Sequence, residues 1–123
     1  MKKYLKTHEW VEFSNETTAR IGISDYAQKA LGDLVFVNLP QEGDEVQAGE
    51  AFGDVESVKA VSDVISPVTG TVAAANQEIM DNPALINEAP YDSWFIEVKD
   101  VSETAELLSE DEYAQFCEKE AQH

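Results

Sequence analysis

The sequence is poor in cysteine and in basic residues. Cys117 is the one cysteine among 123 residues, so an internal disulfide is excluded and a reducing compartment is expected, with the cytoplasm as the default. Eight lysines and arginines stand against 25 acids, which gives a net charge of −17. A surface this acidic repels phosphate backbones and anionic lipid. We therefore expect neither nucleic acid nor a membrane among the partners.

Long apolar runs and catalytic motifs are also missing. No stretch approaches the roughly 20 apolar residues of a membrane-spanning helix, and no apolar region follows the basic start, as a secretory signal would require. Two histidines and one cysteine cannot form a usual zinc site without several carboxylates, and the acids lack calcium-loop spacing. There is no phosphate-binding loop and no nucleophile elbow. We expect no metal site and no independent catalysis.

The residues that are present suffice for one globular domain spanning residues 1–123. The hydrophobic fraction of 43% is ordinary for a folded protein, and the length leaves no room for a second core. Between residues 40 and 70, glycine and proline fall at short intervals and separate short apolar runs. Many short strands joined by tight turns are typical of a small sandwich or barrel. The predicted fold class is mostly β.

Runs of β-branched and aromatic residues outside this region predict further strands at Tyr4–Phe13, Thr17–Ile23, Leu34–Leu39 and Trp94–Val98. The continuously apolar start of Leu34–Leu39 predicts a central, buried strand. Residues 76–87 are polar with scattered apolar anchors and predict a loop or a short helical turn. The acids of residues 100–106 predict a connector rather than a strand.

Two helices are predicted from capping signals. A short helix near 24–31 begins after Ser24, a good N-cap, and ends before Gly32, which suits the C′ position. A C-terminal helix near 109–121 begins with the Ser-x-x-Glu spacing of a capping box. Its apolar face, which includes Cys117, is expected to pack on the sheet. Cys117 there is expected to be a buried small hydrophobe rather than a nucleophile.

One lysine lies at the centre of the most regular stretch, Gly53–Gly70. Alternating valine and isoleucine enter and leave Lys59, which predicts a tight hairpin with this lysine at its tip. An exposed lysine is ordinarily surface charge. Here the neighbours are very small, and the acids Glu56 and Asp63 flank the turn. These carboxylates favour a charged amine over a desolvated Schiff-base lysine, so the turn is better suited to presenting Lys59 to another enzyme.

Several motifs together resemble one family. They are His8-Glu9-Trp10, the run IGISDYAQKALGDLVFVNLP, the hairpin ESVKAVSD followed by SPVTG, PALIN before Pro90-Tyr91, and a final helix with Phe116-Cys117. Over nearly its whole length the chain resembles the glycine cleavage H proteins, which are lipoyl carriers. Biotin carriers usually have methionine on both sides of the lysine, where this chain has Val58 and Ala60. Lipoyl domains of 2-oxo acid dehydrogenases usually have Asp-Lys-Ala and lack the two terminal sections.

The resemblance implies a barrel-sandwich hybrid fold and covalent attachment of lipoate to Lys59. It further implies a non-catalytic carrier of aminomethyl groups and reducing equivalents between glycine decarboxylase, aminomethyltransferase and dihydrolipoamide dehydrogenase, after modification by a lipoate-attaching enzyme. A carrier or lipoyl relay for another lipoate-dependent pathway is the alternative.

The resemblance also implies roles for acids near the lysine. Glu9, and after it Asp63, are candidates to contact the ammonium of the carried aminomethyl group, although either could equally be a solvated surface acid. Glu56, Ser57 and Asp63 are candidates for the surface that the lipoate-attaching enzyme and the partners recognise.

Overall fold

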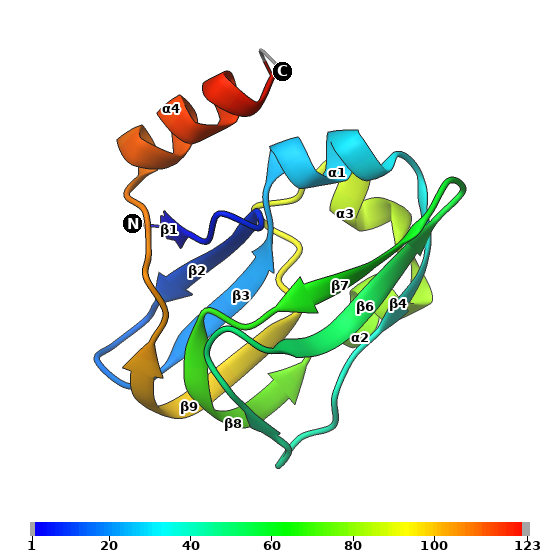
Figure 1. The fold of residues 1–123 in the computed structure, drawn as a ribbon. Coiled ribbons are helices and arrows are strands. Elements are labelled where there is room, and N and C mark those ends of the chain that lie inside the picture. The colour runs from blue at the N-terminus through cyan, green and yellow to red at the C-terminus, as the bar shows by residue number, and fades with distance from the viewer. Residues whose placement is uncertain (1, 122–123) are drawn as a thin grey trace.

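The computed structural model describes residues 2–121 and is mostly β, as the sequence predicts (Figure 1). The strands are β1 (Lys2–Tyr4), β2 (Glu9–Phe13), β3 (Ala19–Ile23), β4 (Leu34–Asn38), β5 (Glu45–Val46), β6 (Ala51–Ser57), β7 (Val61–Ile65), β8 (Val68–Ala75) and β9 (Ile96–Thr104). The helices are α1 (Asp25–Leu31), α2 (Gln77–Asp81), α3 (Ala84–Glu88) and α4 (Glu110–Ala121). The described residues therefore form nine strands and four short helices.

Two antiparallel sheets form the sandwich. One has the strand order β1-β2-β3-β9-β8-β5, and the other has the order β4-β6-β7. Buried side chains of the first sheet, most of them β-branched, form one hydrophobic cluster. Ile21 and Val98 are fully buried within this cluster. A second cluster, which includes Val55 and Phe95, lies beneath the three-stranded sheet and the helices α2 and α3. Burial of these side chains is the main driving force that holds the two sheets together.

The predicted short helix is confirmed as α1. Ser24 is fully buried with extended backbone, and its Oγ accepts a hydrogen bond of 3.2 Å from the Ala27 N–H. At the other end the Gly32 N–H donates to the Gln28 carbonyl at 2.9 Å, and Gly32 has a φ of +83°, which glycine adopts without steric cost. The chain then turns directly into β4.

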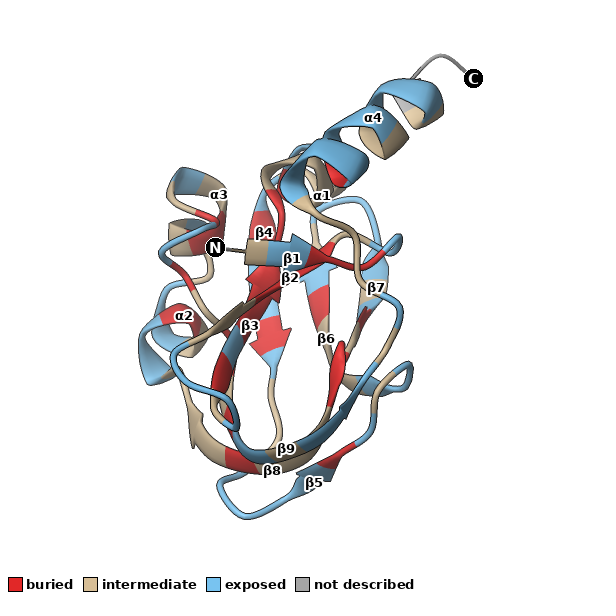
Figure 2. Cartoon of the chain, turned by 90° about the vertical axis from the view of Figure 1, so that its left-hand side faces the viewer, coloured by how far each residue is buried: buried red, intermediate tan, exposed pale blue. Residues whose placement is uncertain are grey.

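The predicted C-terminal helix is confirmed as α4, together with its capping box. The Glu112 N–H donates to Ser109 Oγ and the Ser109 N–H donates to Glu112 Oε1, at 3.2 and 2.9 Å. Tyr113, in the first turns, stacks on Tyr4 of β1 with 4.2 Å between ring centroids. Most of α4 is exposed (Figure 2), so its contact with the body is confined to one side. Cys117 lies on that side but is half-buried rather than buried.

Three sequence predictions about individual segments were wrong. The run beginning at Leu34 forms β4, which is an edge strand rather than a central one, and Val35 and Phe36 are 55% and 53% exposed. Its inner face is formed by Leu34 and Val37, while a register shift between Leu34 and Phe36 turns the intervening apolar side chains outward. Residues 100–104 continue β9 instead of forming a connector. Tyr4–Phe13, predicted as one strand, is divided between β1 and β2. The alternative of a short helical turn within residues 76–87 is close to the structure, which has two short helices, α2 and α3, on either side of Pro83.

Candidate functional site

The hairpin formed by β6 and β7 presents Lys59. Glu56 of β6 pairs with Val61 of β7, and the residues between them form the turn. Figure 1 shows this hairpin projecting beyond α1 at the edge of the molecule, so its tip stands clear of the sandwich. Lys59 is exposed there. A partner can therefore reach the amine without moving any other element.

Hydrogen bonds fix the conformation of this turn. Ser57 Oγ accepts from the backbone N–H groups of Lys59 and Ala60, at 3.1 Å each, and the Ser57 N–H donates to the Ala60 carbonyl at 2.8 Å. The Val58 N–H donates to the Asp33 carbonyl at 3.1 Å, which ties the tip to the turn between α1 and β4. Ser57, predicted as a recognition residue, thus has a defined part in shaping the hairpin.

The lysine side chain extends past Gly32. A Cβ atom placed on Gly32 would lie 2.9 Å from Lys59 Cε, closer than real Cβ contacts come. Asn87 holds this glycine in place, because its Nδ2 donates to the Gly32 carbonyl at 2.9 Å. None of the ion pairs within residues 2–121 involves Lys59. The amine is accordingly accessible from solvent.

Glu9 occupies a different environment, at the start of β2. Its side chain is only 3% exposed, and the Ile65 N–H donates to its Oε2 at 2.8 Å while the Thr7 hydroxyl donates to its Oε1. Burial raises the pKa of this carboxyl from about 4.5 to about 7, against the opposing effect of the hydrogen bonds. The protonated form of Glu9 therefore persists to a higher pH than that of an exposed glutamate. An arriving cation would favour the ionised form.

Lys59 and Glu9 lie at opposite ends of β7. The lysine precedes Val61, and Glu9 binds the N–H of Ile65, the last residue of the strand. Four residue steps along a strand span about 13 Å, so the two side chains do not meet directly. Since β7 is an edge strand, a long flexible group attached to Lys59 could lie alongside it. Asp63 is exposed midway along that path.

A pocket of about 420 Å³ opens at the Glu9 end of β7. It is lined by Leu5, Lys6, Thr7, Gly49, Ile65, Ala105 and Glu106. Two of these residues, Thr7 and Ile65, are the hydrogen-bond donors to the Glu9 carboxylate. The Glu9 end of β7 thus combines a hollow with a buried acid, and the lining of the hollow also includes the cation Lys6 and the acid Glu106.

Sequence reasoning missed a polar network on the other side of Glu9. His8 has a φ of +80°, and its Nδ1 lies 2.7 Å from the Tyr113 hydroxyl, which is 2.5 Å from Ser24 Oγ. The other ring nitrogen, Nε2, lies 2.8 Å from Glu120 Oε2. Desolvation lowers the pKa of His8 and outweighs the opposing influence of Glu120. The network anchors α4 next to the segment that carries Glu9, and only the motif His-Glu-Trp hinted at it.

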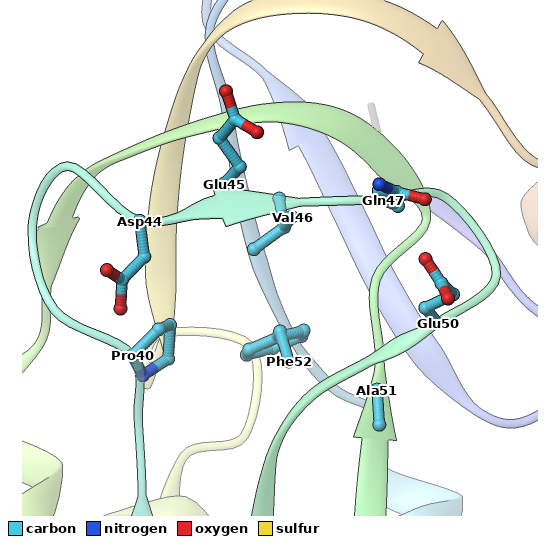
Figure 3. A pocket seen from close by; sticks show the side chains of 8 residues that line it. All are labelled: Pro40, Asp44, Glu45, Val46, Gln47, Glu50, Ala51 and Phe52. Atoms are coloured by element: carbon cyan, nitrogen blue, oxygen red, sulfur yellow. The ribbon is translucent and has the colours of Figure 1, made fainter.

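A further pocket, of about 450 Å³, lies around β5 and the start of β6 (Figure 3). Figure 3 shows Val46 and Phe52 pointing toward each other at its centre, while Glu45 points away. This pocket is at the opposite end of β6 from Lys59. Over the described residues 2–121, no group of three or more histidine, cysteine or acidic side chains could hold a metal ion.

The buried acid gives a measurable pH dependence. Because folding raises the pKa of Glu9 from about 4.5 to about 7, the folded state holds one more proton than the unfolded state between these values. The stability that the folded protein gains from this raised pKa is fully present below pH 4.5 and is lost as the pH rises to 7. We expect Glu9→Gln to gain about 3 kcal/mol in free energy of unfolding relative to the parent across this range, and to level off above pH 7.

Urea unfolding, followed by tryptophan fluorescence at several pH values, would measure this difference. Glutamine can still accept from the Ile65 N–H, so packing is preserved. Glu103→Gln, which removes a carboxylate from an exposed position on β9, is the matched control, and its difference from the parent should stay flat. A flat difference for Glu9→Gln as well would contradict the assigned environment.

The fold and the lysine together define a class: a small two-sheet domain that displays an exposed lysine at a hairpin tip. The profile of the glycine cleavage H-protein family matches residues 2–120. The chain is 60% identical over 117 residues to the glycine cleavage system H protein of Lachnoclostridium phytofermentans, covering 95% of this chain and 92% of that one. It is 55% identical over 114 residues to a probable glycine cleavage system H protein of Haloarcula marismortui, covering 90% and 89%.

A solved structure agrees. The crystal structure of a glycine cleavage system H protein from Mycobacterium marinum matches with a TM-score of 0.87 and 41% identity, over 93% of this chain and 94% of that one. The chain belongs to the glycine cleavage H-protein family. It is the lipoyl carrier of the glycine cleavage system, a non-catalytic component, and the family carries lipoate on a lysine. Within residues 2–121, no helix is long and apolar enough to cross a membrane.

Proposed function

We propose that Lys59 is the lysine that bears lipoate. The observation that carries this proposal is an exposed amine, free of ion pairs within residues 2–121, at the tip of a hairpin whose turn is fixed by hydrogen bonds. Lipoate bound there as an amide supplies a strained cyclic disulfide that can be opened, loaded and closed again. The chain itself holds and presents this group.

The proposed partners follow from membership of the glycine cleavage system. A lipoate-attaching enzyme modifies Lys59, and the chain then visits glycine decarboxylase, aminomethyltransferase and dihydrolipoamide dehydrogenase. Its 123 residues act as one carrier domain, and the proposed compartment is the cytoplasm, in keeping with the single Cys117. Tethering keeps the cargo at high effective concentration during transfer.

Glu9 has the proposed role of contacting the ammonium of the carried aminomethyl group. Its burial, its position at the far end of β7 and the adjacent pocket support this role. A buried carboxylate lacks the hydration that an exposed one enjoys, so it gains more from an arriving cation. Asp63 is the second candidate, but it is exposed and therefore screened by water.

Glu56, Ser57 and Asp63 have the proposed role of recognition by the attaching enzyme and the partners. Glu56 and Asp63 are exposed on the two strands of the hairpin. Glu56 belongs to the pair next to the turn, opposite Val61, and Asp63 lies two residues further along β7, opposite Asp54. Ser57 contributes by fixing the turn and with it the direction in which Lys59 leaves the hairpin.

A reconstituted exchange reaction would test the function. The chain is first incubated with a lipoate-attaching enzyme, lipoate and ATP, and intact mass establishes whether one lipoyl group is gained. The product is then added to glycine decarboxylase with glycine and labelled bicarbonate. We expect label to enter the carboxyl group of glycine with the lipoylated chain, and none to enter with the unmodified chain, because only the former has a group that can receive the cargo.

A lipoylated domain of a 2-oxo acid dehydrogenase is the control for specificity and should support far less exchange. If the chain gains no mass while this control domain is modified in the same tube, the assignment of Lys59 fails. If it gains a lipoyl group but supports no exchange, the proposed decarboxylase partnership fails.

A further inference from the structure

Exposed large hydrophobic side chains are concentrated around the lysine hairpin. Val58 and Val61 flank Lys59 and are 69% and 65% exposed, and Val35 and Phe36 on the neighbouring strand β4 are more than half exposed. Within residues 2–121, the one other exposed large hydrophobic side chain is Tyr91, at 38%. Scattered exposed hydrophobics are ordinary, but a group on one face is typical of an interaction surface.

The strand register places part of this group in one row. Phe36 of β4, Glu56 of β6 and Val61 of β7 lie opposite one another across the three-stranded sheet. Because side chains alternate between the faces of a sheet, all three point away from the core, in contrast to the buried Val55 that follows the opposite parity. Glu56 thus lies between two exposed apolar side chains, Phe36 and Val61, next to the hairpin turn that carries Lys59.

The next row on the same face is acidic. Asn38, Asp54 and Asp63 lie opposite one another, so two carboxylates face each other directly across β6 and β7. Like charges in this position destabilise a sheet. The described ion pairs of residues 2–121 include neither aspartate and do not include Glu56. The face therefore keeps an uncompensated negative charge beside its apolar row, on a chain whose net charge is −17.

We propose that this outer face of β4-β6-β7 is the docking surface for the enzyme that attaches lipoate to Lys59, and that this enzyme presents an apolar seat rimmed by arginine or lysine. Phe36 and Val61 fill the seat, and Asp54, Glu56 and Asp63 meet the basic rim. The inference rests on Lys59 being the lipoylated residue. Charge complementarity selects a basic partner, and the continuity of the face with the lysine selects the enzyme that must reach it.

The surface is preorganised for such a partner. The Ser57 and Asp33 hydrogen bonds hold the turn, so the apolar row and Lys59 keep a fixed spacing. Docking then orders little that was mobile before, which lowers the entropic cost of association. The row also determines the direction from which the enzyme approaches. An enzyme bound to Phe36 and Val61 has Lys59 next to its binding surface, at the end of the sheet.

Steady-state lipoylation kinetics, with the unmodified chain as the varied substrate, would test the proposal. We expect the double variant Phe36→Ala and Val61→Ala to raise KM about tenfold with little change in kcat, because both side chains act in docking rather than in transfer. We expect Asp63→Lys to lower kcat/KM and to weaken its dependence on ionic strength, since it removes attraction to the basic rim. Both changes lie on the outer face, and thermal melting would verify that each variant is folded.

Two matched controls are available. Glu103→Lys changes the net charge by the same amount as Asp63→Lys but lies on the exposed part of β9. Tyr91→Phe removes the hydroxyl of a 38% exposed aromatic residue that lies outside the outer face and accepts a hydrogen bond from the Asp25 N–H. Both should behave like the parent. If the folded outer-face variants keep the parent KM while the parent is lipoylated normally, the docking proposal is overturned and Lys59 stands. If they fail only in the decarboxylase exchange reaction, the face serves that enzyme instead and the proposal is equally wrong.

Discussion

Lys59→Arg is expected to abolish lipoylation completely. Amide formation requires an amine that can lose its proton and attack an activated acyl group, whereas a guanidinium remains protonated in proteins. The variant preserves the positive charge and approximate length of the side chain, and the turn is held by main-chain groups and Ser57 rather than by the lysine ammonium. Folding should therefore be unchanged. Intact mass after incubation with the attaching enzyme should show no gain, against one lipoyl group on the parent.

Lys29→Arg provides the matched control. Lys29 is also exposed, but it lies on α1 and pairs with Asp25 at 2.9 Å. This variant should gain one lipoyl group at the rate of the parent. A lipoyl group on folded Lys59→Arg would show that attachment occurs elsewhere, and the site assignment would then have to be abandoned.

Glu9→Ala is expected to shorten the lifetime of the aminomethyl-loaded chain about tenfold or more. The carboxylate is buried, and a charge-assisted hydrogen bond to an ammonium in such a site contributes more than a neutral one. Without it the loaded end of the arm is held less firmly and is exposed to hydrolysis. Lipoylation itself should proceed at the parent rate, because Glu9 lies at the opposite end of β7 from Lys59. Intact mass, recorded over time without aminomethyltransferase, measures the lifetime.

Two further variants separate charge from packing. Glu9→Gln retains an acceptor for the Ile65 N–H, so a short lifetime in this variant as well would assign the effect to the lost charge. Asp63→Asn tests the second candidate and should change the lifetime little, since Asp63 is exposed. An unchanged lifetime in both Glu9 variants would remove Glu9 from the proposed role.

The features that the sequence predicted well depend on local chemistry. The two serine N-caps, Gly32 after α1 and the alternation around Lys59 each involve residues within a few positions of one another. The geometry of such elements is determined largely by neighbouring side chains, so it can be predicted without knowledge of the fold. The family resemblance extended the prediction to the arrangement of the two sheets.

The features that the sequence did not predict depend on distant parts of the chain. Glu9 is buried because the end of β7, 56 residues away, covers it, and no local pattern distinguishes it from a surface acid. The bond between His8 and Tyr113 joins residues 105 positions apart. The apolar run of β4 indicated burial on both faces, but strand order leaves Val35 and Phe36 in contact with solvent. That error coincides with the surface proposed for docking.

The turn at the hairpin tip has a consequence for the whole cycle. Its hydrogen bonds join Ser57, Ala60 and the main chain of Lys59, and none of them uses the lysine side chain. Converting the ammonium to a neutral amide, or changing what the amide carries, leaves these bonds intact. Bare, oxidised and loaded chains therefore keep the same turn conformation and present the same hairpin tip to each enzyme. Each enzyme must distinguish its proper substrate by probing the arm, and bare chains act as competitors wherever modification is incomplete.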